Sequence, residues 1–105
     1  MIEQIGTGSL LFKEPPFLLE SASIVGTKEG QGPLGSLFDV VGSDDKFGQD
    51  SWEKAESEML RQCAVEAVKK AGMTDSGVQA FMAGDLNAQI IASGFCARAL
   101  GMPFM

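Results

Sequence analysis

The chain of 105 residues has 45% hydrophobic and 21% charged residues, which is ordinary for a globular protein. Its formal charge of −6 excludes the basic surface that phosphate backbones require, so we expect no nucleic-acid partner. It contains no histidine and two cysteines, Cys63 and Cys96, without a CxxC motif. This usage is typical of cysteines in the core of a protein from a reducing compartment, and it predicts neither a disulfide framework nor a zinc site.

The first residues do not resemble a signal peptide, because Glu3 stands where a basic region belongs and the apolar runs are short. No stretch is long and apolar enough to predict a transmembrane helix. The length fits one domain at most.

The first 48 residues predict little regular structure. Residues 9–12 predict a short strand that ends before Pro15 and Pro16, and residues 21–25 predict the first core strand. Residues 26–48 are rich in glycine and predict a long irregular connection. Lys28 is misplaced for a phosphate-binding loop, and residues 43–54 lack the ligands of a calcium-binding loop, so both sites are rejected.

Residues 50–71 predict the clearest helix. Asp50 and Glu53 have the spacing of a capping box, and Gly72 is suited to end the helix. Apolar residues recur on one face at helical spacing: Trp52, Ala55, Met59, Leu60, Cys63, Ala64, Ala67, Val68 and Ala71. The other face is charged. We therefore expect a surface helix that packs on a sheet by one side.

The last third predicts a strand at residues 78–83, a loop at 84–87 and a helix at 88–100 that ends at Gly101. A further strand is expected from Met102. The helix is apolar nearly all round, with only Gln89, Ser93 and Arg98 polar. Such a helix is typical of the middle of a large protein or of an interface, so we expect it to be covered by something that this chain does not contain.

Three polar residues follow the predicted strand and are the candidate binding residues: Asp85, Asn87 and Gln89. In α/β proteins, ligands bind at the carboxyl ends of such strands. A purely structural role is the alternative, in which Asn87 caps the helix and Asp85 accepts hydrogen bonds from loop amides.

The order of strands and helices predicts an α/β fold with an incomplete sheet. Several blocks resemble the amino-terminal part of the stage V sporulation protein AD family: SASIVG at 21–26, EG at 29–30, GPLG at 32–35, FD at 38–39, SWEKAE at 51–56 and AGDLNAQII at 83–91. The resemblance runs over nearly the whole chain, and the blocks at 51–56 and 83–91 are its most specific parts.

This resemblance implies a thiolase-like fold, related to the β-ketoacyl synthases, of which residues 1–105 are the amino-terminal part of a single domain, truncated before the turn that carries the nucleophile. It implies a sporulation protein that binds dipicolinic acid (pyridine-2,6-dicarboxylic acid), alone or as its calcium chelate. It also implies assistance to dipicolinate uptake into the developing spore with other stage V sporulation membrane proteins. The expected location is the cytoplasm or forespore, peripheral to the spore inner membrane, and the full-length protein is expected to be a homodimer.

Two alternatives stay open: a fragment of a thiolase-type acyltransferase or condensing enzyme, and a truncated chain without activity of its own. The chain itself predicts no enzyme, because it has no histidine, no nucleophile–base pair and no cluster of metal ligands. Cys63 and Cys96 lie in predicted helices before the nucleophile-bearing turn of the resembled family. No catalytic residue and no cofactor is therefore expected here.

Overall fold

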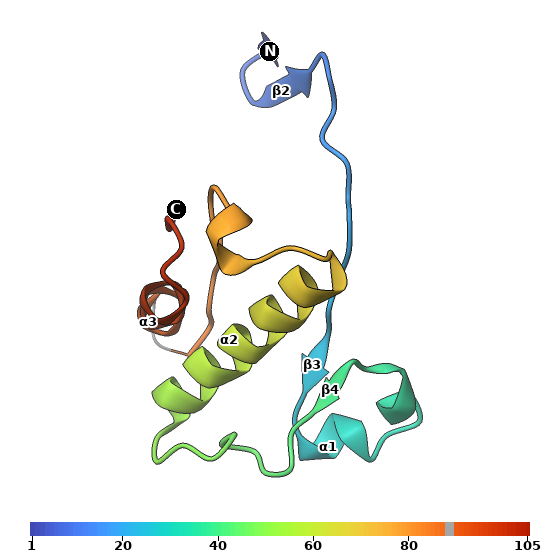
Figure 1. Cartoon of the computed structure of the whole chain (residues 1–105), viewed down its shortest axis with the longest axis vertical. Helices are drawn as coiled ribbons and strands as arrows, with labels where there is room; N and C mark the ends of the chain where they lie inside the picture. The colour runs from blue at the N-terminus through green and yellow to red at the C-terminus, as the bar shows by residue number, and fades with distance from the viewer. Residues whose placement is uncertain (88–89) are drawn as a thin grey trace.

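The computed structural model describes residues 1–87 and 90–105. It is a mixed α/β structure built around one long helix, α2 (Trp52–Lys70). Helix α3 (Ile91–Leu100) packs along α2 on one side, and the short strands β3 (Ile24–Val25) and β4 (Val40–Val41) lie on the other (Figure 1). The α/β class predicted from the sequence is confirmed. Within the described residues, none of the helices combines the length and apolar character of a membrane-spanning segment.

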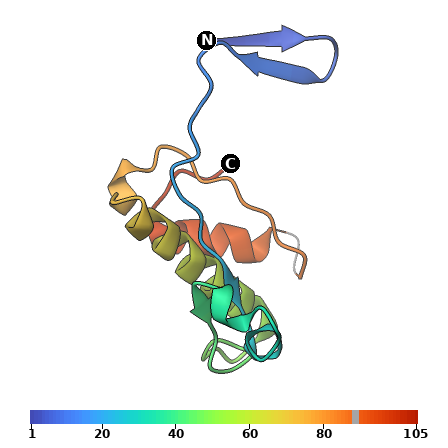
Figure 2. The same ribbon diagram turned by 90° about the vertical axis from the view of Figure 1, so that its right-hand side faces the viewer.

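The N-terminal residues form an antiparallel hairpin of β1 (Ile2–Ile5) and β2 (Ser9–Phe12), with Ile2 opposite Phe12 and Ile5 opposite Ser9. Figure 2 shows this hairpin projecting from the rest of the molecule at the end of an extended segment. All eight strand residues are exposed. The predicted strand at 9–12 is confirmed, whereas β1 was missed because the first eight residues carry no clear pattern.

Strands β3 and β4 form a parallel pair, with Ile24 opposite Val40. The predicted strand at 21–25 is shortened to two residues. The prediction of an irregular connection at 26–48 is wrong, because this segment contains α1 (Thr27–Gly30), the 3₁₀ turn η1 (Gly35–Leu37) and β4.

Two glycines allow this tight crossover. A Cβ on Gly35 would clash with the backbone carbonyl of Gly30, and a Cβ on Gly30 would clash with the side chain of Val41. Elements this short leave no periodic pattern in a sequence, so the glycines are the signal that could have predicted the close approach.

Helix α2 begins one residue later than predicted. Its N-cap is Ser51, whose hydroxyl accepts a hydrogen bond from the Lys54 amide at 3.3 Å. The predicted capping by Asp50 is wrong, and Asp50 instead pairs with the Lys54 ammonium at 2.9 Å. The helix ends at Lys70, and Gly72 follows in the left-handed conformation that terminates helices (φ 69°), as predicted.

The expected one-sided packing of α2 is wrong. Residues 56–68 are half-buried on every side, because β3 contacts one side of the helix and α3 another. The charged side is therefore not simply solvated: Glu58 and Arg61 form a partly buried ion pair at 2.6 Å, and this pairing lowers the pKa of Glu58. Trp52, predicted on the packed face, is 56% exposed.

The predicted strands at 78–83 and from 102 are reduced to one parallel bridge between Phe81 and Phe104. The Phe81 amide donates to the Pro103 carbonyl at 2.6 Å, and the Met105 amide donates to the Phe81 carbonyl at 2.8 Å. The expectation of a buried strand is wrong, since Met82 is 74% exposed.

Helix α3 begins at Ile91 rather than at Ala88, which lies outside the described residues, and it ends before Gly101 (φ 67°), as predicted. Its buried side consists of small residues: Ala92, Ser93, Cys96 and Ala97. Larger apolar residues of the same helix face outward, as the sequence predicts for a helix with more apolar surface than the chain can cover.

Candidate functional site

An open hollow of about 500 Å³ lies between the N-terminal half of α2 and the loop of residues 84–87. Its walls are apolar and aromatic side chains interspersed with carboxylates and one amide: Asp45, Phe47, Trp52, Ala55, Glu56, Met59, Gly84, Asp85, Leu86 and Asn87. We call it the α2 hollow. Two of the three binding residues predicted from the sequence, Asp85 and Asn87, line it.

Helix α2 supplies one wall of the hollow through a single row of side chains. Trp52, Ala55, Glu56 and Met59 are three or four positions apart, which places them on one face of the helix. Trp52 is the first helical residue, and it lines the hollow while remaining 56% exposed. The sequence pattern assigned Trp52 to the core, and its half-exposed position makes it a candidate binding residue that the pattern missed.

The loop before α2 supplies a second aromatic ring and a cation. The Asp44 carboxylate accepts hydrogen bonds from the amides of Lys46 (2.8 Å) and Gly48 (3.2 Å), which fixes a tight turn with Phe47 at φ 50°. The turn places Phe47 in the wall and the Lys46 ammonium 5.0 Å from the centre of the Trp52 ring. The sequence predicts only an irregular connection here and rejects a calcium loop; an Asp with a glycine four residues later is the pattern that indicates such a turn.

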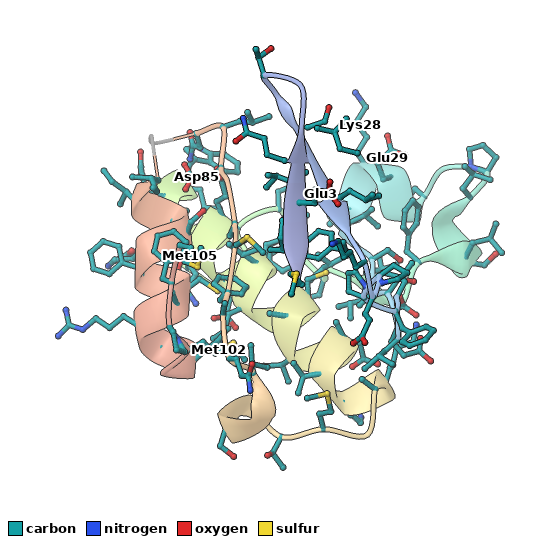
Figure 3. The ribbon with its side chains drawn as sticks, turned by 90° about the horizontal axis from the view of Figure 1, so that it is seen from above. Glu3, Lys28, Glu29, Asp85, Met102 and Met105 are labelled. Carbon is teal, nitrogen blue, oxygen red and sulfur yellow. The ribbon has the colours of Figure 1, made fainter. Side chains whose placement is uncertain are left out.

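Asp85 holds the start of α3. Its Oδ1 accepts a hydrogen bond from the Ile90 amide at 2.8 Å, and its Oδ2 accepts from the amide and hydroxyl of Ser93 at 3.0 and 2.8 Å. Figure 3 shows Asp85 by the N-terminal end of α3, with Met102 near the other end. The structural alternative is confirmed for Asp85, which accepts hydrogen bonds from backbone amides, and it is wrong for Asn87, because the N-cap of α3 is Ile90.

The other two carboxylates of the α2 hollow also bind backbone. Glu56 Oε1 accepts from the Leu86 amide at 3.2 Å, which joins α2 to the loop of residues 84–87. Asp45 Oδ1 accepts from the amide of Thr27 at 3.3 Å and from its hydroxyl, which joins the turn to α1. Over residues 1–87 and 90–105, no group of three or more His, Cys, Asp or Glu side chains is arranged to hold a metal ion.

Of the other two predicted binding residues, the structure describes Asn87 and not Gln89. Asn87 is exposed in the wall of the hollow, where its amide can donate to or accept from a ligand. Gln89 lies outside the described residues. A binding role for Asp85, Asn87 and Gln89 therefore stays a prediction, to which Trp52, Phe47 and Lys46 are added.

Neither of the two cysteines lines the α2 hollow. Cys96 is fully buried, and Cys63 is half-buried with its Sγ 3.4 Å from the Ala22 carbonyl, to which it donates. Burial raises the pKa of both thiols. Since the thiolate is the nucleophilic form, this environment suits structural cysteines rather than reactive ones.

Comparison with known proteins identifies the group to which the chain is related. The profile of the family described as stage V sporulation protein AD matches residues 6–105. The stage V sporulation protein AD of Bacillus subtilis (strain 168) is 34% identical over 100 residues, a match that covers 95% of this chain and 30% of the relative. The chain thus spans less than a third of that relative's length, and it belongs to the stage V sporulation protein AD family.

Proposed function

We propose that this chain acts in sporulation by binding dipicolinic acid, most readily as its calcium chelate, and that it assists uptake of this compound into the developing spore. Family membership supports the sporulation-related role. The observation that carries the ligand proposal is the α2 hollow, which combines two aromatic rings, one amide and a nearby cation.

The shape and lining of the hollow fit a small planar aromatic acid. Its volume of about 500 Å³ is within the range of small-molecule sites. The rings of Trp52 and Phe47 can stack on a pyridine ring. Asn87 can donate to a ligand carboxylate, and Lys46, beside Trp52, supplies positive charge at the rim.

The carboxylates of the hollow favour the calcium chelate over the free dianion. Asp45, Glu56 and Asp85 line the same space and would repel a bare dicarboxylate in a partly desolvated site. A calcium ion carried by the ligand reverses this repulsion, because calcium prefers oxygen ligands and accepts six to eight of them.

A binding role, rather than catalysis, is the proposal for this chain. It contains no histidine to act as a base. Burial raises the pKa of both cysteines, which disfavours a thiolate nucleophile of the acyltransferase type.

For the family member as a whole, the proposal includes a thiolase-like fold with residues 1–105 as its amino-terminal part, and a homodimer. It also includes association with other stage V sporulation membrane proteins at the spore inner membrane. The parallel β3–β4 pair with its helical crossover supports a layered α/β domain. Attachment through partner proteins agrees with the lack of a membrane-spanning helix among the residues that the structure describes.

Titration of the 105-residue chain with dipicolinate, with and without calcium, tests the ligand proposal through calorimetry and Trp52 fluorescence. We expect Asn87→Ala to weaken binding about five- to tenfold, the loss of one or two hydrogen bonds, with little change in melting temperature. Gln89→Ala is expected to act likewise. Trp52→Leu should weaken binding by a similar factor because the stacking surface is lost.

Asp85→Asn is expected to weaken binding only when calcium is present. Gln31→Ala, an exposed change at the C-cap of α1, is the control and should leave the affinity unchanged. Unchanged affinity in both Asn87→Ala and Trp52→Leu would remove the α2 hollow as the binding site.

A further inference from the structure

Glu56 connects α2 to the loop of residues 84–87 across the α2 hollow. Its Oε1 accepts a hydrogen bond from the Leu86 amide at 3.2 Å. Glu56 lies one turn after Trp52 in the row of side chains that lines the hollow, and it is half-buried. Glu53, three residues earlier on the same helix, is exposed. A carboxylate that is partly removed from water needs a hydrogen-bond partner, and the Leu86 amide is one for Glu56.

The loop of residues 84–87 has little side-chain packing of its own. The Leu86 side chain is fully exposed, and a Cβ built on Gly84 would meet no atom within 4 Å. Hydrogen bonds hold the loop instead. Asp85 ties it to the start of α3, whereas the bond from the Leu86 amide to Glu56 ties it to α2. The bond to Glu56 therefore sets how far the loop stands from the helical wall of the hollow.

Asn87 follows the bonded amide directly in the chain. It lies in the wall of the hollow, where its side-chain amide can donate to a ligand carboxylate. Donor–acceptor distances of such hydrogen bonds span only about half an ångström. A small displacement of Leu86 would therefore carry the Asn87 amide out of reach of a ligand that lies against α2.

Glu56 also stands where two spaces meet. Besides the α2 hollow, it lines a second hollow of about 200 Å³, whose other walls are apolar side chains and a glycine: Ile24, Met59, Leu60, Cys63 and Gly84. A carboxylate that turned into this apolar space would lose its hydrogen bonds at a large cost in free energy. The Leu86 amide therefore favours the position of Glu56 at the border between the two hollows.

We propose that Glu56 is a positioning residue of the α2 hollow: through the Leu86 amide it holds the loop of residues 84–87 at the distance from α2 that lets Asn87 meet a ligand. The inference rests on the proposed function for the nature of this ligand, a planar aromatic dicarboxylate. It adds a residue that acts through the loop rather than by contact with the ligand. The role needs an oxygen acceptor and not a charge, so glutamine fulfils it.

Amide hydrogen exchange of the ligand-free 105-residue chain, followed by NMR, tests the contact to the loop. Glu56→Ala should raise the exchange rate of the Leu86 amide at least fivefold, whereas Glu56→Gln should keep it within twofold of the wild-type rate. Glu53→Ala, an exposed change on the same helix, is the control and should leave this rate unchanged. Equal exchange in Glu56→Ala and wild type would overturn the proposal, whether or not the chain binds dipicolinate.

Calorimetric titration with dipicolinate, with and without calcium, tests the action through Asn87. Glu56→Ala and Glu56→Gln remove the same charge, so the difference between them reports the acceptor alone. We expect Glu56→Gln to bind at least fivefold more tightly than Glu56→Ala. Adding Asn87→Ala to Glu56→Ala should cost less than a further twofold, because the displaced loop has already lost that contact. Adding Trp52→Leu, a change in the other wall, should multiply the two losses.

Two results of the titration would contradict a positioning role. Equal affinities of Glu56→Ala and Glu56→Gln would show that the acceptor has no effect on binding. Losses from Glu56→Ala and Asn87→Ala that multiply would show that the two residues act independently. Circular dichroism of each variant shows whether its helices are intact. A wild-type chain that does not bind dipicolinate, together with the expected exchange rates, would reject the proposed ligand and keep Glu56 as the residue that positions the loop.

Discussion

At the scale of single residues, Asp85 has the clearest structural role in the C-terminal third. Its two oxygens accept hydrogen bonds from the Ile90 amide and from both the amide and the hydroxyl of Ser93. These are donors at the start of α3, where helix amides lack partners within the helix and the dipole favours a negative charge. We therefore expect Asp85→Ala to lower the free energy of unfolding by about 1–2 kcal/mol, measured by urea denaturation followed by circular dichroism.

One further variant separates the hydrogen bonds that Asp85 accepts from its negative charge, and another serves as a control. Asp85→Asn keeps an oxygen acceptor and should lose only part of that stability. Lys28→Ala, an exposed change on α1, should alter stability by no more than about 0.5 kcal/mol. If Asp85→Ala were as stable as the wild-type chain, the assignment of Asp85 as the residue that holds α3 would be wrong.

At the scale of elements, Asp39 joins the parallel strand pair to the last turn of α2. Its carboxylate accepts hydrogen bonds from the Ser23 amide (2.8 Å) and hydroxyl (3.2 Å), and it pairs with the Lys70 ammonium at 3.1 Å. Lys70 also donates to the Ser21 carbonyl at 2.7 Å. The hydrogen bond from the Ser23 amide, and then that from Lys70, lower the pKa of Asp39 below its ordinary value of 3.8.

The direction of this shift predicts how stability depends on pH. A carboxyl group with a lowered pKa in the folded state stabilises the fold fully above its ordinary pKa of 3.8. That contribution is lost as the pH falls from there through the folded-state pKa. We expect the melting temperature of the wild-type chain to fall more steeply below about pH 4 than that of Asp39→Asn. Glu29→Gln, which also removes one negative charge, should keep the wild-type slope; parallel curves for wild type and Asp39→Asn would contradict the prediction.

The sequence predicts an element well when the element is long and its pattern lies within the element itself. Helix α2 has periodic apolar residues over five turns and standard residues at both ends, so its position was predicted to within two residues. The strands β3 and β4 have two residues each, too few for a periodic pattern, and only Gly30 and Gly35 indicate the close approach on which their pairing depends. The strand predicted at 78–83 failed because its apolar run pairs at Phe81 alone within the described residues.

The sequence likewise predicts the part of the candidate site that depends on local pattern and misses the part that depends on tertiary contacts. The sequence located the loop of residues 84–87 from its position after an apolar run, and the structure places this loop in the wall of the α2 hollow. It did not predict that Trp52 and Phe47 would face the loop, because that contact joins residues more than thirty positions apart. The hydrogen bond from the Leu86 amide to Glu56 is likewise a product of tertiary packing, since Glu56 belongs to the charged side of the predicted helix.

At the scale of the whole molecule, the hairpin of β1 and β2 is the part least attached to the rest. Its strands pack chiefly on each other, and Figures 1 and 2 show it separated from the helices by an extended segment. Ile2, Ile5 and Leu10 are more than half exposed, so the hairpin buries little apolar surface. An isolated two-stranded hairpin is at best marginally stable in water.

Deleting residues 1–12 should therefore leave the melting temperature of the remaining chain within about 2 °C of the wild-type value, a change that corresponds to less than about 0.5 kcal/mol. The deletion should also reduce self-association, because the hairpin exposes two unpaired strand edges together with apolar side chains. Differential scanning calorimetry measures the first effect and sedimentation velocity at several concentrations measures the second.

Gly35→Ala, which forces a Cβ against the Gly30 carbonyl, is the contrasting variant and should lower the melting temperature. A fall of more than about 5 °C on deletion would show that the hairpin packs on the body of the molecule and contributes to its stability.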